Sequence, residues 1–414
     1  MKTLITNIGQ LVAVPAGPVP GPDMGRPPVV GNAALLIEDE RIAGFGPASG
    51  FADTSCDRTL DAAGGTVVPG LVDCHTHVVF AGSREAEFVQ RIAGASYIEI
   101  LEAGGGIKNS VRALRAASID DLVEQSEPRI RRMIENGTTT VEIKSGYGLS
   151  PDDEIKTLEA IRRLDGRLPI DLVATFLGAH TVPREFDGRP DDYIDSISSD
   201  ALLGRIAGEK LAEFADVFCE RGAFDVEQSR RFLTRCSAVG LTPRVHAEQI
   251  THSGSARLGV ELGAASVDHL ERVDDDDIGA LAGSDTIPVV LPGCSFFLGS
   301  EPAPARRLID AGLPLALATD CNPGSAMIES LGLIMSMSAM MLGMTPLESL
   351  VACTANAAAA LRRSDRIGAI AVGHQADLLI LDVPNIDLWA YRVGVNAVRT
   401  VLKRGQVIFG KGPA

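Results

Sequence analysis

The sequence predicts an α/β protein in which a TIM-type (β/α)8 barrel is joined to a small β-sandwich domain built from both termini. Two observations predict this fold. Between residues 66 and 364, eight short apolar runs alternate with longer helical patterns, and both ends of the chain consist of short strands punctuated by Gly and Pro. We therefore expect the small β domain at residues 1–65 and 365–414, and the barrel at residues 66–364. An open, doubly wound sheet is the alternative, and it predicts fewer strands and a reversal of strand order.

The barrel strands are expected where short runs rich in apolar residues are bounded by turn residues. The eight runs are Thr66–His77, Thr138–Lys144, Ile170–His180, Ala215–Glu220, Thr242–Glu248, Ala265–Leu270, Thr286–Pro292 and Pro314–Asp320. Helical patterns separate them, for example Ser118–Asn136 and Pro151–Asp165. Eight strand–helix units are the number that closes this kind of barrel.

The two ends of the chain are predicted to contain short strands and no long helix. Residues 33–46 form a hairpin candidate, in which a polar turn separates two apolar strands. Near the other end, Ala376–Asp382 and Val398–Ile408 are predicted strands. Because both ends are β-rich and enclose an α/β middle, we expect them to form one domain together.

Composition and charge limit the class of partner. The 414 residues carry a formal net charge of −16, which argues against nucleic acid or an anionic membrane as a partner. No run of about 18 apolar residues predicts a membrane span. The start of the chain lacks the long apolar core of a signal peptide. The seven cysteines form no CxxC pair, so we expect a reduced, cytoplasmic protein that acts on a small molecule.

Histidines gather at the ends of the predicted barrel strands. The first run ends in His75-Thr76-His77, and residues i and i+2 of a strand point to the same side. The third, fifth, sixth and eighth runs end at or just after His180, His246, His269 and Asp320, respectively. The carboxyl ends of barrel strands converge on one mouth, where active sites of this fold lie. A hydrogen-bonded core histidine is the alternative interpretation of any single one.

Three of these imidazoles and one carboxylate predict a metal centre. We expect His75, His77, His246 and Asp320 to hold one zinc or iron ion, with a position left for water. Such an ion lowers the pKa of water and polarises a carbonyl. The fourth run carries no lysine to bridge two metals, and Lys144 is only a weak candidate, so we expect one ion per chain rather than two.

These residues resemble the metal-ligand pattern of the amidohydrolase superfamily, and Gly373–Leu379 resembles its closing segment. Longer segments are similar to one family within it, the imidazolonepropionases. These segments are His75–Arg84, Gly104–Ile107, Glu142–Leu149, Phe176–His180, Val245–Gln249 and Ala318–Ser325. The resemblance implies metal-dependent hydrolysis of the cyclic amide of imidazolone-propanoate to N-formimidoyl-L-glutamate in histidine catabolism. It also implies a homodimer.

The resemblance further implies the residues that bind the substrate, a small molecule with a carboxylate tail: Arg84, Tyr147, His180, Gln249, Asn322, Gly324 and Ser325. The planar guanidinium of Arg84 matches a carboxylate with two parallel hydrogen bonds. The turn from Asn322 to Ser325 could add backbone N–H and hydroxyl donors. Gly104–Gly106 is interpreted as a flap or a tight turn over the site.

For the mechanism, we expect Asp320 to act as general base on a water molecule. His269, which is not needed as a ligand, would stabilise the oxyanion or relay a proton.

Two other functions are considered. One is the deamination of a heterocyclic base. Barrel deaminases of the superfamily typically carry Glu where this chain has Gln249, and an amide cannot exchange protons with departing ammonia. The neighbouring Glu248 should face the other side of the strand. The other is a non-catalytic metal-binding barrel, which would need no arginine or tyrosine near its metal.

Overall fold

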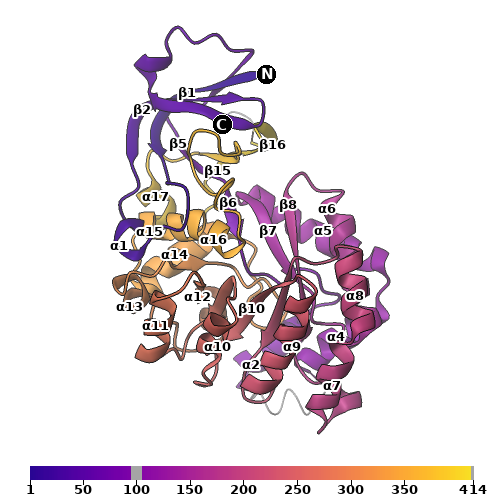
Figure 1. Ribbon diagram of the computed structural model, residues 1–414. Helices are drawn as coiled ribbons and strands as arrows, with labels where there is room; N and C mark the ends of the chain where they lie inside the picture. The colour runs from indigo at the N-terminus through magenta and orange to yellow at the C-terminus, as the bar shows by residue number, and fades with distance from the viewer. Residues whose placement is uncertain (95–104, 412–414) are drawn as a thin grey trace.

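The computed structural model describes residues 1–94 and 105–411, which form two separate sheets with helices packed around one of them (Figure 1). The first sheet has eight parallel strands: β6 (Leu71–Asp73), β7 (Thr138–Lys144), β8 (Asp171–Ala179), β9 (Phe214–Phe218), β10 (Thr242–Ala247), β11 (Ser266–His269), β12 (Ile287–Val290) and β13 (Ala316–Leu317). Neighbours in sequence are neighbours in the sheet. The predicted barrel is therefore confirmed, and the doubly wound alternative, with its reversed strand order, is excluded.

The barrel closes between its first and last strands, just beyond their ends. The backbone N–H of Asp320 donates to the carbonyl of His75 at 3.0 Å, and that of His77 donates to the carbonyl of Cys321 at 3.0 Å. Thr76 and Cys321 thus form a parallel bridge. Closure brings two segments that lie far apart in sequence side by side at the barrel mouth.

Helices follow the barrel strands and cover the outside of the barrel (Figure 1). They are α2 (Glu85–Ile92), α4 (Ile107–Ala116), α5 (Ile119–Glu135), α6 (Pro151–Asp165), α7 (Pro190–Ile197), α8 (Asp200–Gly208), α9 (Val226–Ala238), α10 (Ser255–Glu261), α11 (Asp275–Ala282), α12 (Pro292–Leu298), α13 (Ala305–Asp310), α14 (Leu331–Leu342), α15 (Pro346–Ala352) and α16 (Ala355–Ala360). The helices predicted at Ser118–Asn136 and Pro151–Asp165 are confirmed as α5 and α6. Ser118 begins α5 with a capping box, in which its side chain accepts from the N–H of Asp121.

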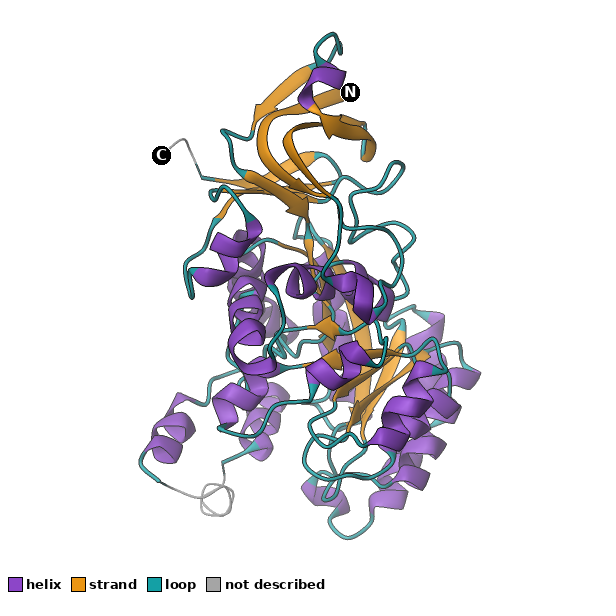
Figure 2. Cartoon of the chain, turned by 90° about the vertical axis from the view of Figure 1, so that its left-hand side faces the viewer, coloured by secondary structure: helices purple, strands orange, loops and turns teal. Residues whose placement is uncertain are grey.

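The second sheet combines both ends of the chain, as expected (Figure 2). Its strands are β1 (Lys2–Val12), β2 (Val29–Glu38), β3 (Arg41–Pro47), β4 (Arg58–Asp61), β5 (Thr66–Pro69), β14 (Leu378–Leu381), β15 (Val398–Lys403) and β16 (Gln406–Gly410). Three short helices lie in the terminal segments: α1 (Gly21–Met24), the 3-10 turn Ala48–Phe51 and α17 (Ile386–Tyr391). A further 3-10 turn, Arg184–Phe186, follows β8. The hairpin predicted over residues 33–46 is confirmed as β2 and β3.

Two predicted strands differ from those observed. The run Val398–Ile408 is a hairpin of β15 and β16 rather than one strand, because Arg404 and Gly405 turn the chain with φ of 48° and 73°. The run Thr66–His77 is shared between the sheets: β5 pairs with β1 and β14, and only β6 enters the barrel. The chain passes between the sheets at Gly70, where an added Cβ would lie 2.5 Å from Thr139 Oγ1. The division into domains at residue 65 stays a prediction.

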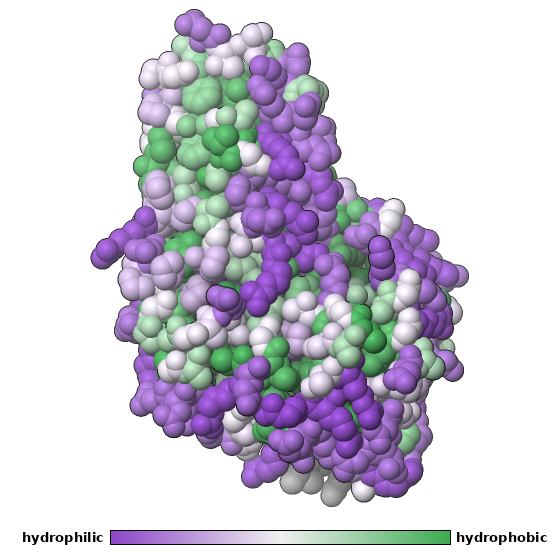
Figure 3. Space-filling model, viewed as in Figure 1, coloured by the Kyte–Doolittle hydropathy of each residue, from purple (hydrophilic) through white to green (hydrophobic). Residues whose placement is uncertain are grey.

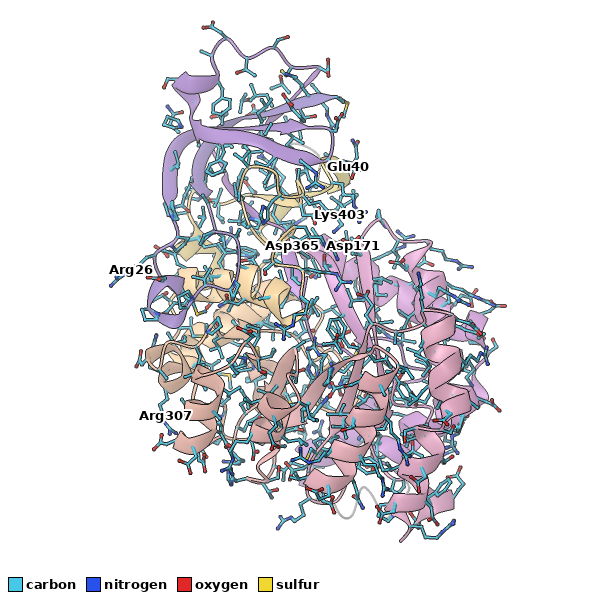
Figure 4. The ribbon with its side chains drawn as sticks, in the orientation of Figure 1. Arg26, Glu40, Asp171, Arg307, Asp365 and Lys403 are labelled. Atoms are coloured by element: carbon cyan, nitrogen blue, oxygen red, sulfur yellow. The ribbon has the colours of Figure 1, made fainter. Side chains whose placement is uncertain are left out.

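Charged groups join the sheet of both termini to the barrel. Lys403 of β15 is buried, and its Nζ lies 2.7 Å from Asp171 Oδ2 at the start of β8 and 2.8 Å from Asp377 Oδ2. Figure 4 shows Lys403 and Asp171 next to each other at this junction. The junction lies at the amino ends of the barrel strands, so the mouth with α2 faces the opposite, lower edge of Figure 1. Hydrophilic residues predominate at that edge in Figure 3. Within residues 1–94 and 105–411, no helix is both long and apolar enough to cross a membrane.

Candidate metal centre and active site

The four residues predicted to hold a metal meet at the barrel mouth, with their side chains buried. Asp320 Oδ1 lies 3.6 Å from His75 Nε2 and 3.6 Å from His77 Nε2. His246 Nε2 lies 3.4 Å from His77 Nε2. The hydrogen bonds that close the barrel bring His75, His77 and Asp320 together. His246 projects from β10 toward the same place.

Three of the distances between these donor atoms, 3.4–3.6 Å, suit ligands of one metal ion. Ligand atoms about 2.0–2.1 Å from zinc lie about 3.3 Å from one another, close to the spacing observed here. His75 Nε2 is fully buried and has no hydrogen-bond partner among the described residues, so its lone pair points into the centre unused. Burial lowers the pKa of His75 and of His77 well below the usual value, which favours the neutral imidazole that binds metals.

Buried carboxylates orient two of these histidines. Asp268 Oδ2 lies 2.6 Å from His75 Nδ1, and Asp216 Oδ2 lies 3.0 Å from His246 Nδ1. A carboxylate at Nδ1 holds the proton there and leaves Nε2 free to bind a metal. These carboxylates fix which nitrogen of each ring faces the centre.

His269 ends β11 beside the same centre. Its ring centroid lies 5.6 Å from that of His75 and 5.2 Å from that of His246. One nitrogen from each of these three rings falls within a 4.8 Å group, so His269 also faces the centre. Burial lowers the pKa of His269, but the carboxylates of Glu271 and Asp320 raise it by more, and the net shift is upward.

Three strand ends at this mouth adopt left-handed backbone conformations without being glycine. The φ angles are 52° at Glu248, 87° at His269 and 54° at Asp320. Such conformations cost on the order of 1–3 kcal/mol each and persist where the surrounding structure holds them. Their concentration at one mouth marks it as a functional site.

A cavity of about 220 Å³ opens over this centre. Its wall contains all seven residues expected to bind the substrate: Arg84, Tyr147, His180, Gln249, Asn322, Gly324 and Ser325. His77, His246, His269 and Asp320 form its floor. The structure thus brings the predicted site residues together, while the role of each stays a prediction.

Basic side chains lie on one wall of the cavity. Arg84 donates from Nε and Nη2 to Glu87 Oε2, at 2.9 and 2.7 Å. Arg91 lies nearby, with its guanidinium carbon 5.0 Å from the centroid of the Phe297 ring. Sequence reasoning missed Glu87 and Arg91. The signal was present, because residues 84, 87 and 91 share one face of a helix.

Glu87 also accepts a hydrogen bond from Gly106 N at 3.0 Å, which fixes the start of α4 beside this wall. Gly104, the first residue of the predicted glycine flap, lies outside the described residues.

The turn after Asp320 is held by its own asparagine. Asn322 Oδ1 accepts from Gly324 N and Ser325 N, both at 2.8 Å, and its Nδ2 donates to the carbonyl of Asp320 at 2.7 Å. The backbone N–H groups expected to serve an anion are therefore already bonded within the turn. The turn's hydrogen bonds stabilise the position of Asp320.

Aromatic and amide groups form the opposite wall. His180 Nδ1 lies 2.9 Å from the carbonyl of Gly146, so it carries the proton and leaves Nε2 as an acceptor. Burial lowers the pKa of His180 to about 4, which keeps the ring neutral. Gln249 lies 3.7 Å from Cys294 Sγ through its Nε2. Glu248 faces away, as predicted, and accepts from Ser253 N at 2.7 Å.

Comparisons with known proteins agree with this geometry. Residues 246–408 match the model of the Amidohydrolase family. The chain is 47% identical to imidazolonepropionase of Geobacillus kaustophilus, over 93% of this chain and 92% of that protein. It is 44% identical to imidazolonepropionase of Geobacillus sp. (strain WCH70), over 99% and 98%. In fold it is similar to atrazine chlorohydrolase from Arthrobacter aurescens complexed with zinc (TM-score 0.70, 18% identity, 99% and 95% coverage).

The identity to these relatives extends over nearly the whole of both chains. This chain is therefore a member of the imidazolonepropionase family, within the amidohydrolase superfamily.

Proposed function

We propose that this chain hydrolyses the cyclic amide of imidazolone-propanoate to N-formimidoyl-L-glutamate, a step of histidine catabolism. One observation carries the proposal: a single cavity is lined by three of the four proposed metal ligands, His77, His246 and Asp320, and by two arginines, Arg84 and Arg91. The substrate has the matching groups, a ring amide at one end and a carboxylate at the other. Both ends can be bound at once.

The charges on the cavity wall favour a monoanion. Among the described residues that line the cavity, Arg84 and Arg91 each carry one positive charge and Glu87 forms an ion pair with Arg84, so the two guanidinium groups outnumber the carboxylate on this wall. Burial lowers the pKa of Arg91, and Arg84 lowers it further because the two guanidinium groups repel each other. A substrate carboxylate between them would relieve this repulsion.

The floor of the cavity supplies the chemistry. His75, His77, His246 and Asp320 would hold the metal ion, which would supply Lewis-acid chemistry by lowering the pKa of water and polarising the ring carbonyl. Asp320, whose side chain lines the cavity, would accept the proton of the attacking water.

The remaining residues hold the ring and the charge that develops on it. His269 stabilises the oxyanion that develops on the carbonyl oxygen, or relays the proton. His180 and Gln249 would hold the ring nitrogens. As the tetrahedral intermediate collapses, the ring C–N bond would break, and the proton taken from water by Asp320 would pass to the departing nitrogen.

The absorbance of imidazolone-propanoate, followed with and without a chelator, tests the proposal. We expect decay of the substrate signal, with N-formimidoyl-L-glutamate as product, only in the metal-loaded protein. A metal-loaded protein without turnover would instead be a non-catalytic metal-binding barrel. Release of ammonia from aminated heterocycles would favour a deaminase. Gln249 argues against that reaction, and so does Glu248, which is buried and faces away from the cavity.

We further propose one zinc or iron ion per chain, a homodimer and a cytoplasmic location. The dimer is supported by exposed apolar side chains on and near α14 and α17, where Met340 is 65% and Tyr391 81% exposed. Light scattering coupled to size exclusion measures the assembly. The negative net charge of the chain supports a small molecule, and not nucleic acid, as the partner.

A further inference from the structure

Lys144 lies inside the barrel beneath the candidate metal centre and is fully buried. Its Nζ lies 2.8 Å from Glu142 Oε1, 2.9 Å from Asp216 Oδ2 and 3.8 Å from Asp268 Oδ2. These carboxylates are completely buried as well. One ammonium group is therefore shared by three carboxylates that project from three different strands, β7, β9 and β11.

Two of these carboxylates hold imidazoles of the metal centre. Asp268 lies 2.6 Å from His75 Nδ1 through the same oxygen that faces Lys144. Asp216 lies 3.0 Å from His246 Nδ1, again through the oxygen that faces Lys144, and its other oxygen accepts from the backbone N–H of His246 at 3.2 Å.

The third carboxylate, that of Glu142, binds the backbone between His75 and His77. Glu142 Oε2 accepts from the N–H of Thr76 at 3.1 Å, and Thr76 separates His75 from His77. The carbonyl of Thr76 in turn accepts from the backbone N–H of Lys144 at 2.9 Å. His75 and His246 are thus each connected to Lys144 through one carboxylate, and His77 is connected only through the backbone of the neighbouring Thr76.

We propose that Lys144 is a positioning residue, whose ammonium group holds three carboxylates in the arrangement that aims His75, His77 and His246 at one metal ion. The inference rests on the proposed metal centre, since Lys144 itself contacts none of the ligands' donor atoms. It assigns to one residue the geometry of ligands from two separate strands.

The physical reason is the cost of buried negative charge. Without Lys144, Glu142, Asp216 and Asp268 would face one another with Arg244 as the remaining buried cation that contacts one of them, at 3.0 Å from Asp268. Buried carboxylates that lose their cation take up a proton or move apart. In either case they no longer accept a hydrogen bond from Nδ1 in the same place, and the rings can turn.

Lys144 stays charged in this position. Burial and Arg244 lower its pKa, but Asp216, Glu142 and Asp268 raise it by more, and the net shift is upward. A neutral amine at this position could not balance the carboxylates.

A purely structural lysine is the competing explanation, and the chain offers a matched control. Lys403 is also buried and also sits between carboxylates, Asp171 and Asp377, but at the junction of the two sheets. Its ammonium group contacts Thr140, Asp171 and Asp377, none of which is a proposed ligand. Lys144→Met and Lys403→Met therefore remove the same group from two buried ion clusters, only one of which adjoins the metal centre.

The experiment uses the full-length protein without substrate. Metal affinity is measured by competition with a chromophoric chelator for Zn²⁺, and ligand geometry by the visible absorption of the Co²⁺-loaded protein. For Lys144→Met we expect the affinity for Zn²⁺ to fall about 10- to 100-fold, the range typical when a residue that supports a metal ligand is mutated. We also expect the absorption spectrum of the Co²⁺-loaded protein to change. For Lys403→Met we expect a lower melting temperature, with affinity and spectrum as in the wild type.

Wild-type affinity and spectrum in Lys144→Met would overturn the proposal, and so would an equal loss of affinity in Lys403→Met. If Lys144→Met does not fold, Glu142→Gln removes one of the three contacts at nearly constant shape. We expect it to weaken metal binding by a smaller factor, and unchanged binding would also overturn the proposal. Turnover by the wild type is measured separately, so failure of the proposed reaction is distinguishable from failure of this inference.

Discussion

The guanidinium of Arg84 occupies the space in which a side chain on Gly324 would begin. A Cβ added at Gly324 would lie 2.2 Å from Arg84 Nη1, far inside contact distance. Arg84 cannot swing away freely, because Nε and Nη2 are bonded to Glu87. The glycine of this turn is therefore needed for the position of an arginine that lies about 240 residues earlier in the sequence.

Gly324→Ala should displace Arg84 and weaken substrate binding. Loss of a hydrogen-bonded charge pair with the substrate carboxylate costs about 1.5–3 kcal/mol, so KM should rise about 10- to 100-fold with kcat less affected. Steady-state kinetics on imidazolone-propanoate measures this. Gly204→Ala on α8 is the control, because an added Cβ there meets nothing within 4 Å. An unchanged KM in Gly324→Ala would contradict the assignment of Arg84.

Arg91→Gln should also raise KM, because it removes the charge that Glu87 does not balance. Arg91→Lys keeps that charge but loses the planar group, so we expect an intermediate KM. Arg131→Gln, which removes an exposed arginine from α5, controls for net charge. Equal KM values for the wild type and Arg91→Gln would leave Arg84 as the sole carboxylate ligand and refute this prediction.

His269→Ala should lower kcat by about 10²- to 10³-fold while KM changes little, because its role lies in the transition state. The same kinetic assay separates the two parameters, and the metal content of the variant must match that of the wild type. A variant in which KM alone rises would show that His269 binds substrate instead.

Removal of the metal should abolish activity, and one equivalent of zinc or iron(II) per chain should restore it. Three imidazoles and one carboxylate suffice to hold a single ion and leave a further position for water. Lys144 is held by Glu142 and Asp216, so it is not placed to bridge a second ion. Elemental analysis of the reconstituted protein measures the ratio, and two equivalents per chain would contradict the prediction.

The junction of the two sheets should contribute stability that depends on pH. Burial raises the pKa of Asp171, but Lys403 and Arg404 lower it by more, so the net shift is downward. A carboxylate with a lowered pKa stabilises the fold above its unfolded-state pKa of about 4, and this contribution is lost as the pH falls through the folded-state value.

Asp171→Asn should therefore lower the melting temperature at neutral pH, and the difference from the wild type should shrink in acid. Thermal melts between about pH 7 and pH 3 follow this change. Asp120→Asn is the control, since Asp120 forms an exposed pair with Arg163. A difference that stays constant with pH would mean that the charge of Asp171 does not stabilise the junction.

The sequence was sufficient to predict the barrel and the residues of its mouth, because both depend on local patterns. Eight apolar runs gave the strand count, and the i, i+2 spacing of His75 and His77 predicted the first two proposed metal ligands. The crossing at Gly70 was missed because the apolar run continues without interruption from one sheet into the other. Pairing with β14, some 300 residues away, decides where β5 belongs.

The sequence does not predict the side-chain contacts of Asn322 and Lys144, because no periodicity or motif specifies which partners these side chains bind. The turn after Asp320 contains donors suited to an anion, yet Asn322 binds them itself. Lys144 was considered only as a bridge between metals, whereas the structure places its ammonium among three carboxylates.

Closure of the barrel has a consequence for how the protein matures during synthesis. His75 and His77 leave the ribosome early, but the hydrogen bond from Asp320 to His75 forms only after the last barrel strand has been made. The nascent chain therefore carries an incomplete ligand set for most of its synthesis. Metal loading is expected to be one of the last events of maturation, and tight metal binding would report that the whole barrel has folded.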